Sequence, residues 1–215
     1  MLKIERMDRV RAALRAQGLT QMIVCDPKSV WYLTGVAVEP YERLLALYLP
    51  TEGEPVLFLN RLFNVPEPPC RAVWHTDTDK PVAQIAEVVD AGRPLGIDKE
   101  WPAKFLIPLM ETHPGMQVVL SSDCVDDCRA CKDAEEQALM REASRINDAV
   151  NETAKHYIKV GMTEREVAEF IDAQYRAHGC EGPSFTTIVS FGANAADPHH
   201  EPDDTVLKEG RLRAV

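Results

Sequence analysis

The chain has 215 residues, 45% of them hydrophobic and 27% charged, and this composition indicates a folded globular protein and excludes a disordered chain. Its formal net charge of −10 and its pI of about 5.1 argue against nucleic acids and anionic membranes as partners, because both require clustered Lys and Arg. The amino terminus mixes both signs of charge, and the longest apolar run, residues 44–49, is too short to span a bilayer, so we expect a cytoplasmic protein without a membrane anchor.

The first part of the chain alternates between helical and strand patterns. Met7 and Leu14 belong to an apolar stripe at helical spacing, and Gly18 stands where a helix would end, which predicts a helix over residues 2–17. This alternation indicates an α/β domain with a mixed sheet, to which we assign residues 1–125. Strands are predicted at 22–25, 44–49, 56–59, 95–97 and 118–120, and further helical stretches at 29–33, 82–89 and 105–110.

The second part of the chain is dominated by helical patterns. Residues 133–159 contain no Gly or Pro, and their apolar residues fall at spacings that one broad face of a long helix could hold. Thr163 and Glu166 have the spacing of a capping box, in which each side chain satisfies a free backbone N–H group, and this predicts a second helix. Residues 187–191 are β-rich and predict a strand. We assign residues 126–215 to a second domain.

The six cysteines are too few for a disulfide scaffold in a chain of this length, and without an export signal we expect them to be reduced thiols. Cys124, Cys128 and Cys131 lie close together in the sequence. A structural zinc site usually has four ligands, however, and no matching pair of Cys or His follows at a zinc-finger spacing. We therefore interpret these three as small side chains around a linker between the two domains.

A loop with two adjacent histidines follows the predicted strand, and the residues alone leave three interpretations open. An imidazole titrates near neutrality, and the prolines that flank the pair could hold it toward a bound carbonyl group for proton transfer. The histidines could equally be exposed in an ordinary polar loop. A local metal site of Asp197, His199, His200 and Glu201 is disfavoured, because adjacent residues rarely converge on one ion.

Several segments of this chain resemble the pita-bread metallopeptidases, a family that includes Xaa-Pro dipeptidases, aminopeptidase P enzymes and creatinase. The segments are 132–144, the turn 161–166 and the stretch 181–200 with its Pro-His-His sequence. The motifs Trp31-Tyr-Leu-Thr-Gly35 and Tyr41-Glu-Arg-Leu-Leu45 resemble the creatinase-type amino-terminal domain. The resemblance covers nearly the whole chain and implies a creatinase-like domain followed by the first half of a pita-bread domain.

The resemblance also implies a function. The peptidases of this family hydrolyse peptide bonds adjacent to proline. By the resemblance, His199 corresponds to the histidine that hydrogen-bonds the substrate or the tetrahedral intermediate. We expect His199 to be the catalytic residue and His200, Phe185 and Arg43 to be candidate substrate-binding residues. Full-length relatives use two divalent ions (Mn, Zn or Co), act on small peptides and are expected to form homodimers.

In the family the five metal ligands, two Asp, one His and two Glu, follow the Pro-His-His loop. This chain reaches Gly210, in a turn that precedes the first ligand in relatives, and ends at Val215. We therefore expect no metal site in it and no hydrolysis by the chain alone. A non-catalytic dimerisation or partner-binding module and a metal-free hydrolase of the creatinase type are the alternatives. We also expect the residues after about 180 to be loose.

Overall fold

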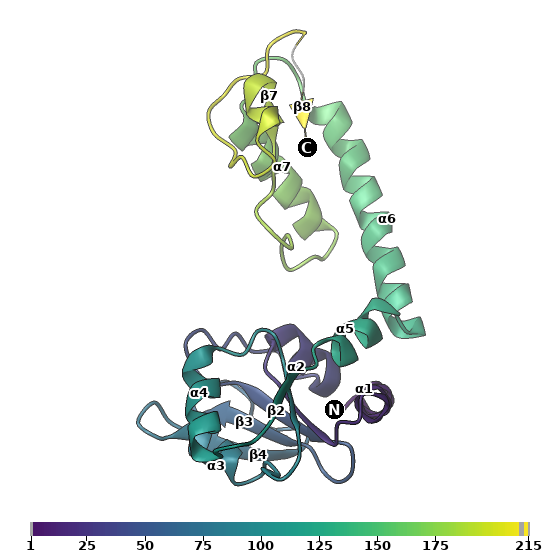
Figure 1. Ribbon diagram of the computed structural model, residues 1–215. Coiled ribbons are helices and arrows are strands. Elements are labelled where there is room, and N and C mark those ends of the chain that lie inside the picture. The colour runs from purple at the N-terminus through teal and green to yellow at the C-terminus, as the bar shows by residue number, and fades with distance from the viewer. Residues whose placement is uncertain (1, 211–212, 215) are drawn as a thin grey trace. The chain divides into compact units, whose positions relative to one another are not determined.

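The computed structural model describes residues 2–210 and 213–214, and the chain divides between Lys132 and Asp133 into two compact units (Figure 1). The predicted boundary at residue 125 falls inside a helix, α5, which packs against the first helix of the chain, α1, within the first unit. No helix in the described part of the chain has the length and apolar character needed to cross a membrane.

The first unit is built on a mixed sheet of six strands in the order β4-β3-β2-β1-β5-β6. The strand β1 lies inside this sheet, antiparallel to β2 on one side and parallel to β5 on the other. The predicted α/β fold with a mixed sheet is therefore confirmed. The strands are β1 (Gln21–Val24), β2 (Ala46–Pro50), β3 (Val56–Asn60), β4 (Arg71–His75), β5 (Leu95–Ile97) and β6 (Val118–Leu120).

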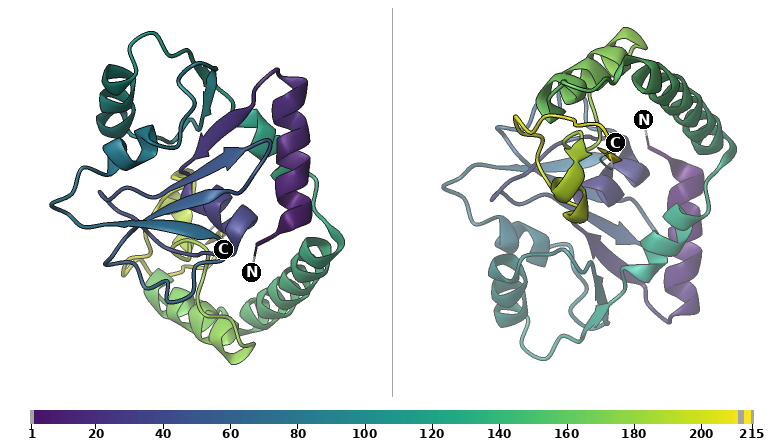
Figure 2. Two further views of the ribbon diagram at one scale, coloured as in Figure 1. Left: turned by 90° about the horizontal axis from the view of Figure 1, so that it is seen from below. Right: turned by 90° about the horizontal axis from the view of Figure 1, so that it is seen from above.

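Helices cover both faces of this sheet, as the left view of Figure 2 shows. Alternate residues of a strand point to opposite faces, so Leu57 joins the core beneath α1, α2 and α5, while Phe58 joins the core beneath α3 and α4. Both side chains are fully buried. The helices are α1 (Ile4–Ala16), α2 (Pro27–Thr34), α3 (Pro81–Ala86), α4 (Ala103–Thr112) and α5 (Asp123–Ala130).

The helix α2 shows how local sequence fixes an element. The carboxylate of Asp26 accepts a hydrogen bond from the backbone N–H of Ser29 at 2.9 Å and so caps the helix, while Pro27 occupies its first turn, where no N–H donor is needed. The helix ends at Gly35, which has a left-handed φ of 76° that most other residues would strain to adopt.

Two elements of the first unit are absent from the sequence prediction. The strand β4 pairs only with β3 and lies at the edge of the sheet, and its apolar run, Ala72-Val73-Trp74, is only three residues long and half-buried. The helix α5 occupies the segment that we interpreted as a linker. It buries Cys124, Val125 and Cys128 against the first core cluster, and the linker interpretation was therefore wrong.

The second unit consists mainly of two helices, α6 (Ala134–Tyr157) and α7 (Glu164–Ala177). Both begin with a capping box, and the box predicted at Thr163 and Glu166 is confirmed. The strand predicted at 187–191 is present only as β7 (Ser190–Phe191), which pairs antiparallel with β8 (Arg213–Ala214) and leads into a 3-10 helix, η1 (Gly192–Ala196). The core is small and comprises Val150, Ala154, Val167, Ile171, Val189, Phe191 and Leu207.

Candidate functional site

The two adjacent histidines lie in a loop of residues 192–205, here called the histidine loop, which follows β7. His199 is exposed, and its backbone N–H donates to Oδ1 of Asp197 at 2.9 Å. His200 is turned inward, and 17% of its side chain is exposed. The two neighbouring imidazoles therefore have different environments, one open to solvent and one enclosed by protein.

A buried carboxylate holds the histidine loop. Glu164, the first residue of α7, is fully buried. Its Oε1 accepts from the backbone N–H of Phe191 at 2.6 Å and from Nδ2 of Asn194 at 3.0 Å. Its Oε2 accepts from Nε2 of His200 at 2.7 Å and from the backbone N–H of Asp203 at 3.1 Å. A buried carboxylate is stable only with such partners, and this one has four.

The hydrogen bonds also fix the tautomer of His200. The amide nitrogen of Asn194 lies 3.0 Å from Oε1 of Glu164, 3.1 Å from Nε2 of His200 and 3.2 Å from Oγ1 of Thr205, and it donates its two hydrogens to the two oxygens. An ionised carboxylate only accepts, so the proton between Glu164 and His200 is carried by Nε2 of the imidazole. His200 is therefore a donor in this network and does not offer Nε2 to another ligand.

The end of the histidine loop returns to the beginning of α7. The first backbone N–H groups of a helix have no partner within the helix. Here the N–H of Glu164 donates to the carbonyl of Thr205 and the N–H of Arg165 to the carbonyl of Asp203, both at 3.1 Å. The loop thus closes on the helix through its backbone as well as through the Glu164 side chain.

One group of potential metal ligands is found among the described residues, namely Glu164, His200 and Asp203. It does not fit a centre for two ions. Both oxygens of Glu164 are occupied by N–H donors, and Nε2 of His200 carries a proton, whereas a metal ligand must present a free lone pair. We therefore interpret this group as a hydrogen-bonded network.

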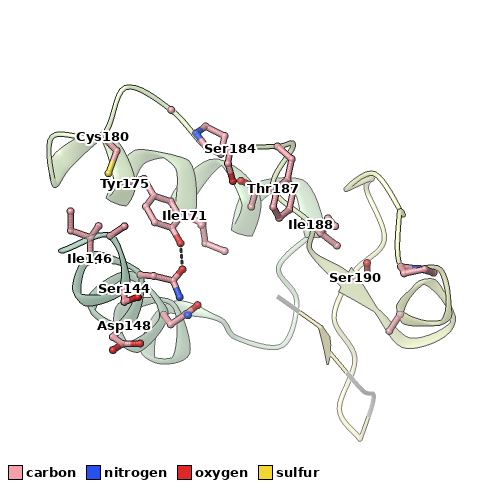
Figure 3. Close-up of a pocket in the computed structure, with 18 of the residues that line it drawn as sticks. Ser144, Ile146, Asp148, Ile171, Tyr175, Cys180, Ser184, Thr187, Ile188 and Ser190 are labelled. Carbon is pink, nitrogen blue, oxygen red and sulfur yellow. Dashed lines mark hydrogen bonds between the residues drawn. The ribbon is translucent and has the colours of Figure 1, made fainter. Parts of the chain in front are cut away.

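A cavity of about 920 Å³ opens within the second unit, between α6, α7 and the segment that leads to β7 (Figure 3). Ile146 of α6 and Ile171 of α7 give it an apolar wall, and the hydroxyl of Tyr175 donates to Oδ1 of Asn147 inside it. The candidate substrate-binding residue Phe185 lines the cavity and is 69% exposed. Asp197 and Pro198 of the histidine loop line it too, but neither histidine does.

Arg43, the remaining candidate, lies in the first unit. Its guanidinium binds Asp77 through Nε and Nη2, each at 3.0 Å, and also reaches Oε1 of Glu42 at 2.8 Å. The hydrogen bond from Arg43 holds the pKa of the Asp77 carboxyl below its usual value, and a further bond from Asn60 acts in the same direction. These contacts give Arg43 a structural role, and its role toward a substrate stays a prediction.

The residues that organise the site, Glu164 and Asn194, are not among the predicted ones. The capping box drew attention to Glu166, whose carboxylate accepts from the backbone N–H of Thr163 at 2.8 Å. Nothing in the sequence marks Glu164 as buried, because its partners lie 27 to 39 positions further along the chain. An acidic residue at the start of a helix is common for electrostatic reasons alone.

An α/β domain followed by a capped helix pair and a fixed Pro-His-His loop is an arrangement that matches two family models. Residues 6–131 match the creatinase/prolidase N-terminal domain, and residues 138–215 match metallopeptidase family M24. The match to the creatinase/prolidase N-terminal domain covers more than half of the chain, and the chain belongs to this family.

Several relatives extend over nearly the whole chain. The probable dipeptidase PepE of Mycobacterium bovis is 30% identical over 98% of this chain, and the putative dipeptidase YkvY of Bacillus subtilis is 28% identical over 96%. The crystal structure of dipeptidase PepE from Mycobacterium ulcerans has a TM-score of 0.87 at 28% identity and covers 98% of this chain. A prolidase from Thermococcus sibiricus has a TM-score of 0.88 at 26% identity and covers 99%. The match spans 58% to 60% of the length of each of these four relatives.

Proposed function

We propose that this protein serves as a peptidase for short peptides, cleaving the bond next to a proline, and that the His199 imidazole contacts the oxygen of the bond that is broken. The observation that carries the proposal is an exposed imidazole on a loop that is held by hydrogen bonds at His199 N–H, at His200 and at Asp203. A donor carried on a loop that is held in place needs less reorganisation when negative charge develops on a carbonyl oxygen. The names of the relatives, dipeptidase and prolidase, agree with this substrate class.

The candidate residues would have different roles in such a peptidase. Phe185 is a candidate contact for an apolar substrate side chain, because it lines the cavity and keeps much of its ring exposed. Arg43 is a candidate contact for a substrate carboxylate, although Asp77 and Glu42 already bind it. His200 is better placed to hold the loop than to bind a substrate, since its Nε2 proton is donated to Glu164.

The M24 family is a family of metallopeptidases, and divalent ions would supply a polarised carbonyl and an activated water. The described residues do not fit such a centre, because their one candidate group is saturated by hydrogen bonds. We therefore propose that hydrolysis requires ligands other than these, and that the 215-residue chain by itself turns over no dipeptide.

Two assays test the function. The first supplies the purified chain with Ala-Pro and Mn²⁺, and we expect no hydrolysis and no tight binding of two ions per chain. The second joins residues 1–210 to the part of M. ulcerans PepE that lies outside the match. We expect this chimera to hydrolyse Ala-Pro, and we expect the activity to be lost on His199→Ala and retained on His156→Ala, an exposed histidine of α6. A fully active His199→Ala chimera would contradict the proposed role of His199.

A second candidate function is a non-catalytic module for dimerisation or partner binding. It is favoured by large apolar side chains exposed on α6, where Leu139 is 65% and Met140 is 54% exposed. Sedimentation of the purified chain, beside a Leu139→Glu variant, would show whether these residues mediate a homodimer. Hydrolysis by the chain that persists in EDTA would favour the metal-free alternative. We further propose a cytoplasmic location.

A further inference from the structure

The contacts of Glu164 reach both ends of the histidine loop. Phe191 immediately precedes the loop, Asn194 lies near its beginning, and His200 and Asp203 lie near its end. The carboxylate is fully enclosed, so water does not compete for its oxygens, and hydrogen bonds in such surroundings are stronger than at the surface. The Glu164 side chain therefore links the two ends of the loop to each other, beside the backbone hydrogen bonds that the end of the loop makes with the start of α7.

His199 stands between fixed neighbours. Its own N–H is bound by Asp197, its preceding residue Pro198 has a restricted φ, and its following residue His200 donates to Glu164. With the backbone fixed on both sides, the imidazole of His199 has only its own side-chain rotamers available. Its direction then depends on the position of the loop, which the Glu164 carboxylate holds together with the backbone hydrogen bonds to α7.

We infer that Glu164 is a positioning residue: its buried carboxylate fixes the histidine loop and so the direction in which His199 presents its imidazole. This inference rests on the proposed function, in which His199 contacts the substrate. It adds a requirement that α7 and the histidine loop act as one rigid element, although Glu164 itself is fully buried.

The chemistry of the four donors requires a carboxylate at this position. A carboxylate has two acceptor oxygens, whereas a glutamine amide of the same shape has one acceptor oxygen and one donor nitrogen. In Glu164→Gln the amide group would therefore face either the N–H groups of Phe191 and Asn194 or those of His200 and Asp203. A neutral imidazole can move its proton to Nδ1 and accept at Nε2, but a backbone N–H cannot become an acceptor. In either orientation the N–H of Phe191 or that of Asp203 would therefore face a donor and lose its acceptor.

The test compares Glu164→Gln with Glu166→Gln in the full chain. Both substitutions remove one negative charge from the first turn of α7, but Glu166 is exposed and caps only Thr163. Side-chain nitrogen NMR reports the tautomer and surroundings of each imidazole, and amide hydrogen exchange reports the hydrogen bonds of Phe191 and Asp203. Circular dichroism confirms that the helices of both variants remain.

In Glu164→Gln we expect exchange at the amide of Phe191 or Asp203 to become about tenfold faster, because one hydrogen bond is lost. We also expect the ring signals of His199 to shift, although this residue makes no contact with Glu164. In Glu166→Gln both sets of signals stay as in the unaltered chain. If the His200 signals shift and the His199 signals do not, Glu164 holds only its direct partner and the inference is overturned.

His200→Ala keeps the test decisive if Glu164→Gln does not fold. This substitution leaves Glu164 with three donors and removes only the link next to His199. We expect the exchange rate at Phe191 to stay within a factor of about two and the His199 ring signals to shift. Unchanged His199 signals would overturn the inference. The spectra require no turnover, so an inactive chimera would refute the proposed function without affecting this result.

Discussion

Different interactions stabilise the interior of each of the two units. In the first unit, the clusters on the two faces of the sheet contain 18 and 12 buried apolar residues. The cluster of the second unit contains seven among the residues described, and its longest loop is held by hydrogen bonds to one buried carboxylate. The free energy gained by burying apolar surface does not depend on the orientation of the groups, whereas the strength of a hydrogen bond does. The first unit therefore derives its stability from its core, and the second derives the shape of its loop from polar contacts.

The largest change in the free energy of unfolding is expected from a substitution that creates a cavity in the first unit. Phe58→Ala removes a fully buried ring from the sheet and should lower the free energy of unfolding by about 3 to 5 kcal/mol. All three tryptophans, Trp31, Trp74 and Trp101, lie in residues 1–132, so their fluorescence in urea follows this unit alone.

The matched control is Phe185→Ala, which removes a ring that is 69% exposed in the second unit. We expect a change of less than about 0.5 kcal/mol. If Phe58→Ala shifts the loss of helical signal of α6 and α7 as far as it shifts the fluorescence, the two units unfold together and the comparison fails.

The next largest difference between the two units is expected in their rates of cleavage by a protease. Residues 181–186 are exposed, whereas residues 191–205 are tied back to α7, so the loose part of the chain is expected to be narrower than everything after residue 180. A protease of broad specificity should cut first within 181–186, at least about tenfold faster than within the sheet. Mass spectrometry identifies the fragments. Equal resistance of both units would contradict this expectation.

A smaller effect is expected from the cap of α7. Thr163→Ala removes the hydroxyl that accepts from the backbone N–H of Glu166 at 3.2 Å and should lower the stability of the second unit by about 1 kcal/mol. Thr153→Ala, at an exposed position inside α6, should be neutral or slightly stabilising, because Ala is the better helix former. Urea unfolding followed by circular dichroism measures both, and equal losses would show that the cap contributes nothing.

The smallest change in stability is expected at alkaline pH, in the first unit. Burial raises the pKa of the Cys70 and Cys124 thiols to about 11. The folded chain holds these protons more tightly than the unfolded chain does. Their contribution to stability is therefore present at neutral pH and is lost as the pH rises from about 9 toward 11.

Urea midpoints by tryptophan fluorescence at neutral pH and at about pH 10 measure this loss. Cys124→Ala should reduce the difference between the two midpoints, whereas Cys131→Ala, at an exposed position, should leave it unchanged. Identical differences in all three proteins would show that buried thiols do not govern the alkaline limit.

The sequence predicted those elements whose own residues show a recognisable pattern, such as an apolar stripe or a capping box. The apolar stripe that includes Met7 and Leu14 gave α1, and both of these side chains are buried. Thr163 and Glu166 gave the start of α7. The edge strand β4 and the helix α5 have no comparable pattern, since their buried residues are few and depend on neighbours that are distant in sequence.

The site was predictable to a similar degree. The Pro-His-His sequence identified the histidine loop, because the motif is contiguous. The burial of Glu164 was not predictable, because it follows from four contacts that exist only when the loop has folded back onto α7. Which of two adjacent histidines turns inward is decided by the same contacts, and residue order alone leaves both possibilities open.

The position of β1 inside the sheet has a consequence for synthesis on the ribosome. β1 is the first strand to emerge, yet its parallel neighbour β5 is made more than 70 residues later. Until β5 arrives, one edge of β1 has no strand beside it, and open apolar edges promote aggregation. Nascent chains that stop before residue 97 should therefore bind chaperones strongly, and those that pass residue 120 should be released.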